Sequence, residues 1–369
     1  MKISLAGVVA CVLFPALVTS QPHPDSALTG FVTDADTGEP IPGVNVFLAG
    51  TALGNTTDGQ GRFSVADVPQ GVYDLVVSIP GFEREIRRVE VRPGGTKPLR
   101  ITLREKLIEA GPVDIVGEQP SEWKERLEEF GKNFFGTTRN AAHCRIRNPE
   151  VLELSVDPAS GRFEAASRTP LVVENHALGY RMEFLMRSFV LEERQFRVGG
   201  WTKFETMVST DETQESEWKR ERVRAYHGSL RHFLSALVQG RSAEEGFRVS
   251  LVRDITMSMV PSLVPEEELT DIIIRPGRLS FERELSFTGY LKVEYLHAFQ
   301  EAGFEDYWGR IIGQKGGWSD RHQFSWLRLS MRPVVLTSDG MPFDSSVLET
   351  YGYWAFERVA EWLPLEYRP

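Results

Sequence analysis

The sequence is poor in cysteine, with only Cys11 and Cys144 among its 369 residues. Cys11 lies in an N-terminal apolar run that we expect to be removed on export, which leaves Cys144 alone. A single thiol forms no internal disulfide, so disulfide-stabilised folds are excluded. The neighbouring Ala141, Ala142 and Ile146 favour a buried and unreactive Cys144 over a reactive one.

Beyond its first twenty residues, which are considered next, the sequence has no apolar run long enough to cross a membrane. Lys2 is followed by the uncharged apolar stretch 3–18 and then by small residues before Gln21, which is the pattern of a cleaved signal peptide. The stretch is shorter than the roughly 20 residues that a membrane-spanning helix needs, which disfavours an uncleaved anchor. We therefore expect a signal peptide at residues 1–20 and no transmembrane helix in the mature chain.

Positive charge is not in excess, with 42 Lys and Arg against 52 Asp and Glu and a formal net charge of -10. Binding to nucleic acid requires a dense basic surface that neutralises phosphates. The arginines between residues 84 and 92 are interspersed with glutamates and so indicate a mixed, solvent-exposed face. Nucleic acid is therefore excluded as a partner.

Catalytic motifs are also missing. The sequence contains no His-x-x-Glu or His-Glu-x-x-His zinc motif, no Gly-x-Ser-x-Gly elbow and no phosphate-binding loop. His227 and His232 lie in a predicted helix about 140° apart around its axis, so they are not expected to share a ligand. We predict no catalytic residue, no metal site and no cofactor. A pair of glycosidase carboxylates has no fixed spacing in sequence, so that class of enzyme stays open.

What the sequence does contain, between residues 28 and 103, is a series of short strands. Val44, Val46 and Leu48 alternate with other residues, as in a strand with one buried face. Clusters of Gly, Pro, Asp and Thr punctuate the segment at turns such as 34–38 and 57–61. Short strands with regular turns and no helical period predict a β-sandwich.

Several motifs in this region make the prediction more specific. Residues 37–46 (TGEPIPGVNV), 57–63 (TDGQGRF) and 81–82 (GF) resemble the carboxypeptidase regulatory-like domain, which is similar to the N-terminal extension of many TonB-dependent transporters of the outer membrane. The resemblance covers residues 27–104 and implies a seven-stranded, prealbumin-like or immunoglobulin-like sandwich. It implies no peptidase activity, because the module is an accessory domain in that family.

The remaining sequence predicts a linker at residues 105–120, rich in Gly and Pro, and a larger β-rich α+β domain at residues 121–369. Helices are expected from Ser121 to Gly131, from Glu217 to Gln239 and from Trp354 to Trp362. Motifs at residues 148–152, 174–180 and 226–234 are similar to those of a group of cell-envelope proteins, which implies architecture and location only.

Aromatic residues are plentiful, with eight Trp, nine Tyr and 22 Phe. Trp308, Trp318 and Trp354 lie near glycines in predicted loops, where exposed rings stack on sugars, and ordinary core packing is the alternative. The sequence as a whole predicts a mainly β, non-catalytic exported protein, periplasmic or outer-membrane-associated, that binds a polysaccharide or an envelope protein. The alternatives are a glycan-acting hydrolase with an unrecognised carboxylate pair, and a structural component of an outer-membrane transport system.

Overall fold

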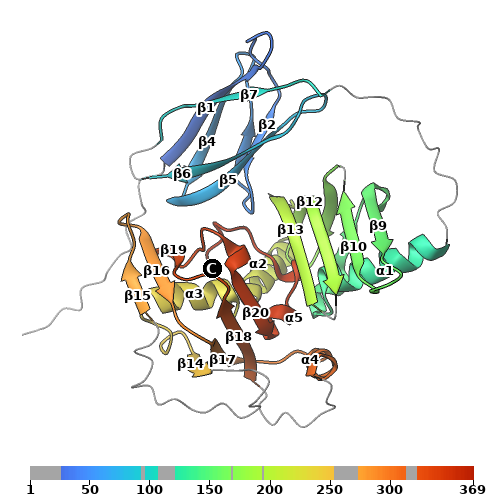
Figure 1. Cartoon of the computed structure of the whole chain (residues 1–369), viewed down its shortest axis with the longest axis vertical. Helices are drawn as coiled ribbons and strands as arrows, with labels where there is room; N and C mark the ends of the chain where they lie inside the picture. The colour runs from blue at the N-terminus through green and yellow to red at the C-terminus, as the bar shows by residue number, and fades with distance from the viewer. Residues whose placement is uncertain are drawn as a thin grey trace, which may run out of the picture.

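The fold is described from a computed structural model that covers residues 26–92, 96–106, 121–167, 169–192, 195–252, 273–312 and 322–369. The expected signal peptide and residues 107–120 of the expected linker lie outside these ranges. The fold is mainly β with a few short helices, which confirms the predicted class (Figure 1). Within the described ranges, no helix combines the length and the apolar character needed to cross a bilayer.

The N-terminal region is a sandwich of seven strands. One sheet has the order β4-β1-β7 and the other the order β3-β2-β5-β6. The strands are β1 (Ser26–Asp34), β2 (Asn45–Leu48), β3 (Gly54–Thr56), β4 (Arg62–Val68), β5 (Gly71–Ser78), β6 (Glu85–Val91) and β7 (Leu99–Leu103). In β4 the buried Phe63 and Val65 alternate with the exposed Arg62 and Ser64, as the period of a strand requires. The seven-stranded sandwich is therefore confirmed.

After the sandwich, the chain forms a six-stranded sheet that packs against helix α1 (Ser121–Phe135). It comprises β8 (Cys144–Ile146), β9 (Leu152–Val156), β10 (Phe163–Ser167), β11 (Leu171–Asn175), β12 (Tyr180–Glu192) and β13 (Gln195–Thr206). Their order is β8-β11-β12-β10-β9, and β13 pairs with β12. Phe130 of α1 contacts Phe189 of β12 with ring centroids 4.9 Å apart. The helix does not end at Gly131 as expected, because Phe134 and Phe135 continue its buried face.

The third β region contains two smaller sheets. Strands β14 (Phe247–Val252), β17 (Tyr290–Phe299), β18 (His322–Leu329) and β20 (Leu348–Gly352) form one sheet, and β15 (Ile273–Pro276), β16 (Glu282–Ser286) and β19 (Val334–Thr337) form the other. Helix α3 (Leu230–Val238) packs Phe233 and Leu234 into the core of this region. Helix α4 (Phe304–Ile312) forms a separate aromatic cluster with β18 and the short α5 (Tyr353–Phe356).

Two of the predicted helices are wrong in extent. The expected helix 217–239 is divided into α2 (Glu212–Tyr226) and α3, because Gly228 between them has a φ of +85°. The expected helix 354–362 is only α5, followed by the 3-10 helix η5 (Val359–Glu361).

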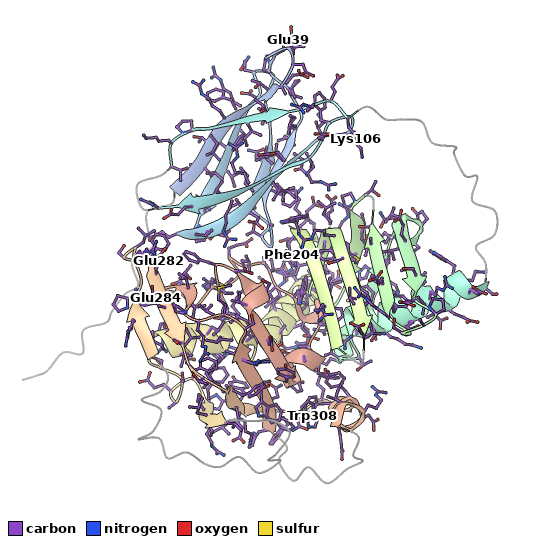
Figure 2. All side chains as sticks on the ribbon, viewed as in Figure 1. Glu39, Lys106, Phe204, Glu282, Glu284 and Trp308 are labelled. Carbon is purple, nitrogen blue, oxygen red and sulfur yellow. The ribbon has the colours of Figure 1, made fainter. Side chains whose placement is uncertain are left out.

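The sandwich is joined to the six-stranded sheet by main-chain hydrogen bonds. The Gly50 N–H donates to the Thr202 carbonyl (2.6 Å), and the Phe204 N–H donates to the Thr51 carbonyl (2.8 Å). The turn between β2 and β3 thereby adds to the edge of β13, and Figure 2 shows Phe204 where the two regions meet. Part of an otherwise open sheet edge is thus covered.

Side chains and the C-terminal segment add to this junction. The Trp201 Nε1–H donates to Asp74 Oδ2 (3.1 Å). The Leu365 N–H donates to the Gly50 carbonyl (2.8 Å), and Glu366 Oε1 accepts from the Ala52 N–H (2.7 Å). The C-terminal segment therefore contacts the first domain directly, although more than 300 residues separate the two.

Candidate functional site

A hollow of about 450 Å³ opens beside α2. Its walls come from the 3-10 helix η1 (Arg139–His143), the turn between β11 and β12, and α2. Its charged and imidazole side chains are those of Arg139, His143, His176, Glu217, Arg220 and Glu221. Asn175 shapes the turn, because its buried side chain accepts from the N–H groups of Ala177 (3.2 Å) and Leu178 (3.1 Å).

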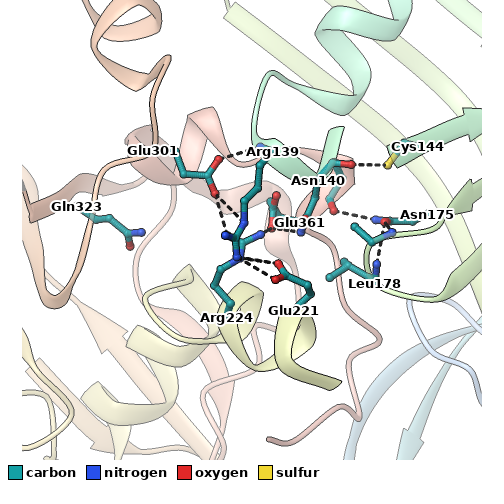
Figure 3. Close-up of polar contacts among 12 residues, drawn as sticks. Arg139, Asn140, Cys144, Asn175, Leu178, Glu221, Arg224, Glu301, Gln323 and Glu361 are labelled. Atoms are coloured by element: carbon teal, nitrogen blue, oxygen red, sulfur yellow. Dashed lines mark hydrogen bonds and ion pairs between the residues drawn. The ribbon is translucent and has the colours of Figure 1, made fainter. Parts of the chain in front are cut away.

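Next to the hollow, Arg224 of α2 lies at the centre of a network of ion pairs (Figure 3). Its guanidinium contacts Glu221 (2.9 Å), Glu301 (2.9 Å) and Glu361 (3.3 Å). Arg139 also binds Glu221 (2.8 Å), which connects the network to the hollow. The network therefore joins α2, η1, the segment before α4 and η5.

Glu361 is the most deeply buried member, with its side chain 4% exposed. Burial raises the pKa of its carboxyl to about 7, although the charge of Arg224 acts in the opposite direction. The Asn140 Nδ2–H donates to its Oε2 (3.0 Å). Burial and the charge of Glu361 also raise the pKa of Glu357 well above its usual range. Part of this acidic cluster is therefore protonated near neutral pH.

The arrangement of these carboxylates favours a structural role over a catalytic one. Hydrolysis by paired carboxyls requires both groups to face the substrate from opposite sides. Of the three carboxylates bound to Arg224, only Glu221 lines the hollow, and it is held by two guanidiniums. Among the described residues, no group of three or more His, Cys, Asp or Glu is placed to hold a metal ion.

A second hollow, of about 430 Å³, lies on the outer face of the sheet β4-β1-β7, which is called the open face of the sandwich below. The Phe31 ring, 41% exposed, lies among the polar side chains of Thr29, Asn55, Thr56, Asp58, Arg62 and Ser64. The Arg62 guanidinium carbon is 5.9 Å from the centre of the ring. This surface combines an exposed aromatic ring with hydrogen-bonding groups around it.

The sandwich matches a family of known domains. Residues 27–104 match the family model of the carboxypeptidase regulatory-like domain. This segment is a carboxypeptidase regulatory-like domain. A stretch of 105 residues is 37% identical to a TonB-dependent receptor of Formosa agariphila, and covers 28% of this chain and 10% of the receptor. The match therefore spans about a tenth of that curated relative.

Solved structures give weaker likenesses. A cohesin–X-dockerin complex of Acetivibrio cellulolyticus is 21% identical, with 22% of this chain and 58% of that chain covered and a TM-score of 0.19. A Bacteroides uniformis protein to which carbohydrate binding is ascribed is 13% identical, with 42% and 56% covered and a TM-score of 0.19. TM-scores this low support no conclusion about function.

The tryptophans predicted to bind a ligand lie elsewhere than in the regulatory-like domain. Trp308 is 4% exposed and stacks on Trp326 at 5.1 Å, at the far side of the molecule from the sandwich (Figure 2). Trp354 is 7% exposed, and its Nε1–H donates to the Gly228 carbonyl (2.7 Å). Both rings therefore pack in a core, which is the alternative that the sequence left open, and their ligand-binding role stays a prediction that their burial does not support. Trp318 lies outside the described residues.

Cys144 is buried, as expected, and its Sγ lies 3.6 Å from the Asn140 carbonyl oxygen. Burial raises the pKa of the thiol to about 12, so it stays protonated at physiological pH. Because the thiolate is the reactive form, this environment favours an inert, structural cysteine.

The prediction that His227 and His232 point apart is wrong. Their ring centroids are 4.9 Å apart, because the chain turns at Gly228 instead of continuing as a helix. His232 Nδ1 accepts from the Gly228 N–H (3.1 Å), and its Nε2 lies 3.4 Å from Glu245. Burial lowers the pKa of His232, which favours a neutral ring that stabilises the turn.

No pattern in the sequence predicts the arginine–glutamate network. Arg224 is separated from Glu301 by 77 residues and from Glu361 by 137, so no local spacing identifies the group. A partial signal is Glu361 itself, a lone acid between apolar residues in the segment 359–363. Such a residue suggests a buried charge with a partner elsewhere in the fold.

Proposed function

We propose that the protein is a non-catalytic, exported protein of the cell envelope, and that its regulatory-like domain binds polysaccharide. The observation that carries this proposal is the exposed Phe31 ring among polar side chains in the hollow of the sandwich. An aromatic ring offers a flat apolar surface to the C–H face of a sugar, while neighbouring hydroxyl and amide groups bind its hydroxyls.

The location in the envelope, either in the periplasm or at the outer membrane, is part of the proposal. It is supported by the signal-like sequence of residues 1–20 and by the similarity of the domain to part of a TonB-dependent receptor. A hydrolase receives less support, because of the two acids that line the α2 hollow, Glu221 is engaged with Arg139 and Arg224, and Glu217 lies 4.0 Å from Arg220.

The experiment is a thermal-shift screen of the mature chain from Gln21 against neutral and acidic polysaccharides, peptidoglycan fragments and divalent metals. A ligand at 100 times its dissociation constant stabilises the folded state by about 2.7 kcal/mol, which is easily detected. We expect at least one polysaccharide to raise the melting temperature without being cleaved. Release of reducing ends would favour the hydrolase instead, and no shift with any glycan would contradict the proposal.

A further inference from the structure

Phe31 has an arginine beside it on each neighbouring strand. Its register partner on the antiparallel strand β4 is Arg62, and its register partner on the parallel strand β7 is Arg100. Residues directly opposite one another on neighbouring strands project from the same face of a sheet. The alternation agrees, because all three residues are exposed while Val32 and Phe63, which follow Phe31 and Arg62, are buried. The open face therefore carries an aromatic ring between two guanidinium groups.

Both guanidiniums are available to a ligand. Within the described part of the chain, neither Arg62 nor Arg100 takes part in an ion pair. Arg92 of the same domain, by contrast, is bound to Glu90 at 2.8 Å. The 5.9 Å contact between Arg62 and Phe31 is at the outer limit of a cation–π interaction, so little is lost when a ligand displaces it.

The remaining polar groups suit a sugar. Thr29 and Ser64 are register partners beside Phe31 and supply hydroxyl groups, and Thr56 lines the same hollow. Asp58 is the one acid in this lining, and its Oδ1 accepts from the N–H groups of Gln60 (2.9 Å) and Arg62 (2.9 Å), which holds it in its turn.

We propose that this face binds an acidic polysaccharide, with a sugar ring stacked on Phe31 and its carboxylate or sulfate held by Arg62 and Arg100. The guanidinium fork matches the geometry of both anions. A protein partner fits less well, because Phe31 is the one exposed large apolar side chain among the described residues of the domain. Protein interfaces instead require a contiguous apolar centre. This inference rests on the proposed function and names the class of glycan.

The test measures binding of the mature chain to polygalacturonate, dextran sulfate, neutral dextran and polyglutamate by isothermal titration calorimetry. The variants are Phe31→Ala, Arg62→Gln, Arg100→Gln and the charge-retaining Arg62→Lys. Matched controls are Phe299→Ala, an exposed ring outside the domain, and Arg92→Gln, an arginine already paired. All of these side chains are exposed, and unchanged circular dichroism checks that each variant is folded.

We expect the wild type to bind the uronate or the sulfate polymer. The affinity should fall about 10-fold in Phe31→Ala, Arg62→Gln and Arg100→Gln. It should fall less in Arg62→Lys and change little in the two controls. Comparison of the two polymers identifies carboxylate or sulfate as the preferred anion. Binding of neutral dextran that depends on Phe31 alone would overturn the acidic class but leave the proposed function. Acidic binding unchanged in all four variants, or equal binding of polyglutamate, would overturn the site, and absence of glycan binding would overturn both proposals.

Discussion

Glu361 is a carboxyl group from which water is largely excluded, and its protonation couples to folding. The pKa of a glutamate carboxyl in water, and hence in the unfolded chain, is 4.5, whereas that of Glu361 in the folded protein is about 7. Between these values the folded protein retains a proton that the unfolded chain has released. The contribution of this group to stability is therefore lost as the pH rises from 4.5 to 7, opposite to the behaviour of a carboxylate with a lowered pKa.

The substitution Glu361→Gln removes this titration and leaves Arg224 with Glu221 and Glu301. We expect the wild type to lose on the order of 1–3 kcal/mol more of its free energy of unfolding than the variant between pH 5 and pH 7.5. Urea unfolding at four pH values measures the difference. Glu128→Gln, at an exposed position of α1, is the control and should leave the pH profile unchanged. Parallel profiles of wild type and Glu361→Gln would contradict this account.

At the scale of elements, the two glycines within predicted helices have opposite roles. Gly131 lies inside α1, and a Cβ added there meets no atom within 4 Å. Gly228 has a φ of +85°, and a Cβ there would lie 2.7 Å from both Gln323 Oε1 and Tyr295 Cδ1. The first glycine is therefore replaceable, whereas the second determines where α2 ends.

We expect Gly228→Ala to lower the free energy of unfolding by about 1–3 kcal/mol, because the left-handed conformation and the close approach both oppose a side chain. Gly131→Ala is the matched control and should raise it by about 0.5–1 kcal/mol through helix propensity. Urea unfolding measures both. Equal effects of the two substitutions would show that Gly228 does not require its positive φ.

Local signals in the sequence predict the strands of the regulatory-like domain but not the helix ends. The seven strands of the regulatory-like domain can be predicted because their alternation and turn residues are local signals. The sequence predicts a helix end at Gly131 and an uninterrupted helix through Gly228, and the structure has the reverse, because the packing of Phe134 and the close approach of Tyr295 are not local signals. Likewise, Trp308 is near a glycine, yet it packs against Trp326. Phe31 carries no signal in the sequence, because a single exposed ring resembles any other strand residue until its register partners are known.

At the scale of the whole molecule, the regulatory-like domain and the larger β-rich part are one connected structure. The turn 49–53 meets both β13 and the C-terminal segment, which Arg231 of α3 also holds through the carbonyl of Pro364 (2.6 Å). The two motifs at residues 174–180 and 226–234 contribute to the same connection, because Asn175 binds the carbonyl of Ala360 (2.8 Å). Each motif thus provides a side chain that contacts the C-terminal segment.

A double-mutant cycle on Asp74 and Trp201 measures the junction. Trp201→Phe removes the N–H donor, and Asp74→Asn removes the charge of the acceptor. We expect a coupling free energy of about 0.5–1.5 kcal/mol in urea unfolding. As the control, Asp74→Asn is combined with Trp362→Phe, whose ring packs against the core of the six-stranded sheet. The effects of these two substitutions on the free energy of unfolding should be additive. A coupling near zero at the first pair would mean that this contact does not connect the two parts.

The parallel pairing of β1 with β7 has a mechanical consequence. The strands lie in register from Gly30 opposite Leu99 to Asp34 opposite Leu103, so the chain enters the domain at one end and leaves it at the other. Tension along the chain therefore pulls the two strands lengthwise past each other. Every hydrogen bond between them is loaded at once instead of breaking one after another. Separating the two terminal strands by tension along the chain would therefore require several backbone hydrogen bonds to break together.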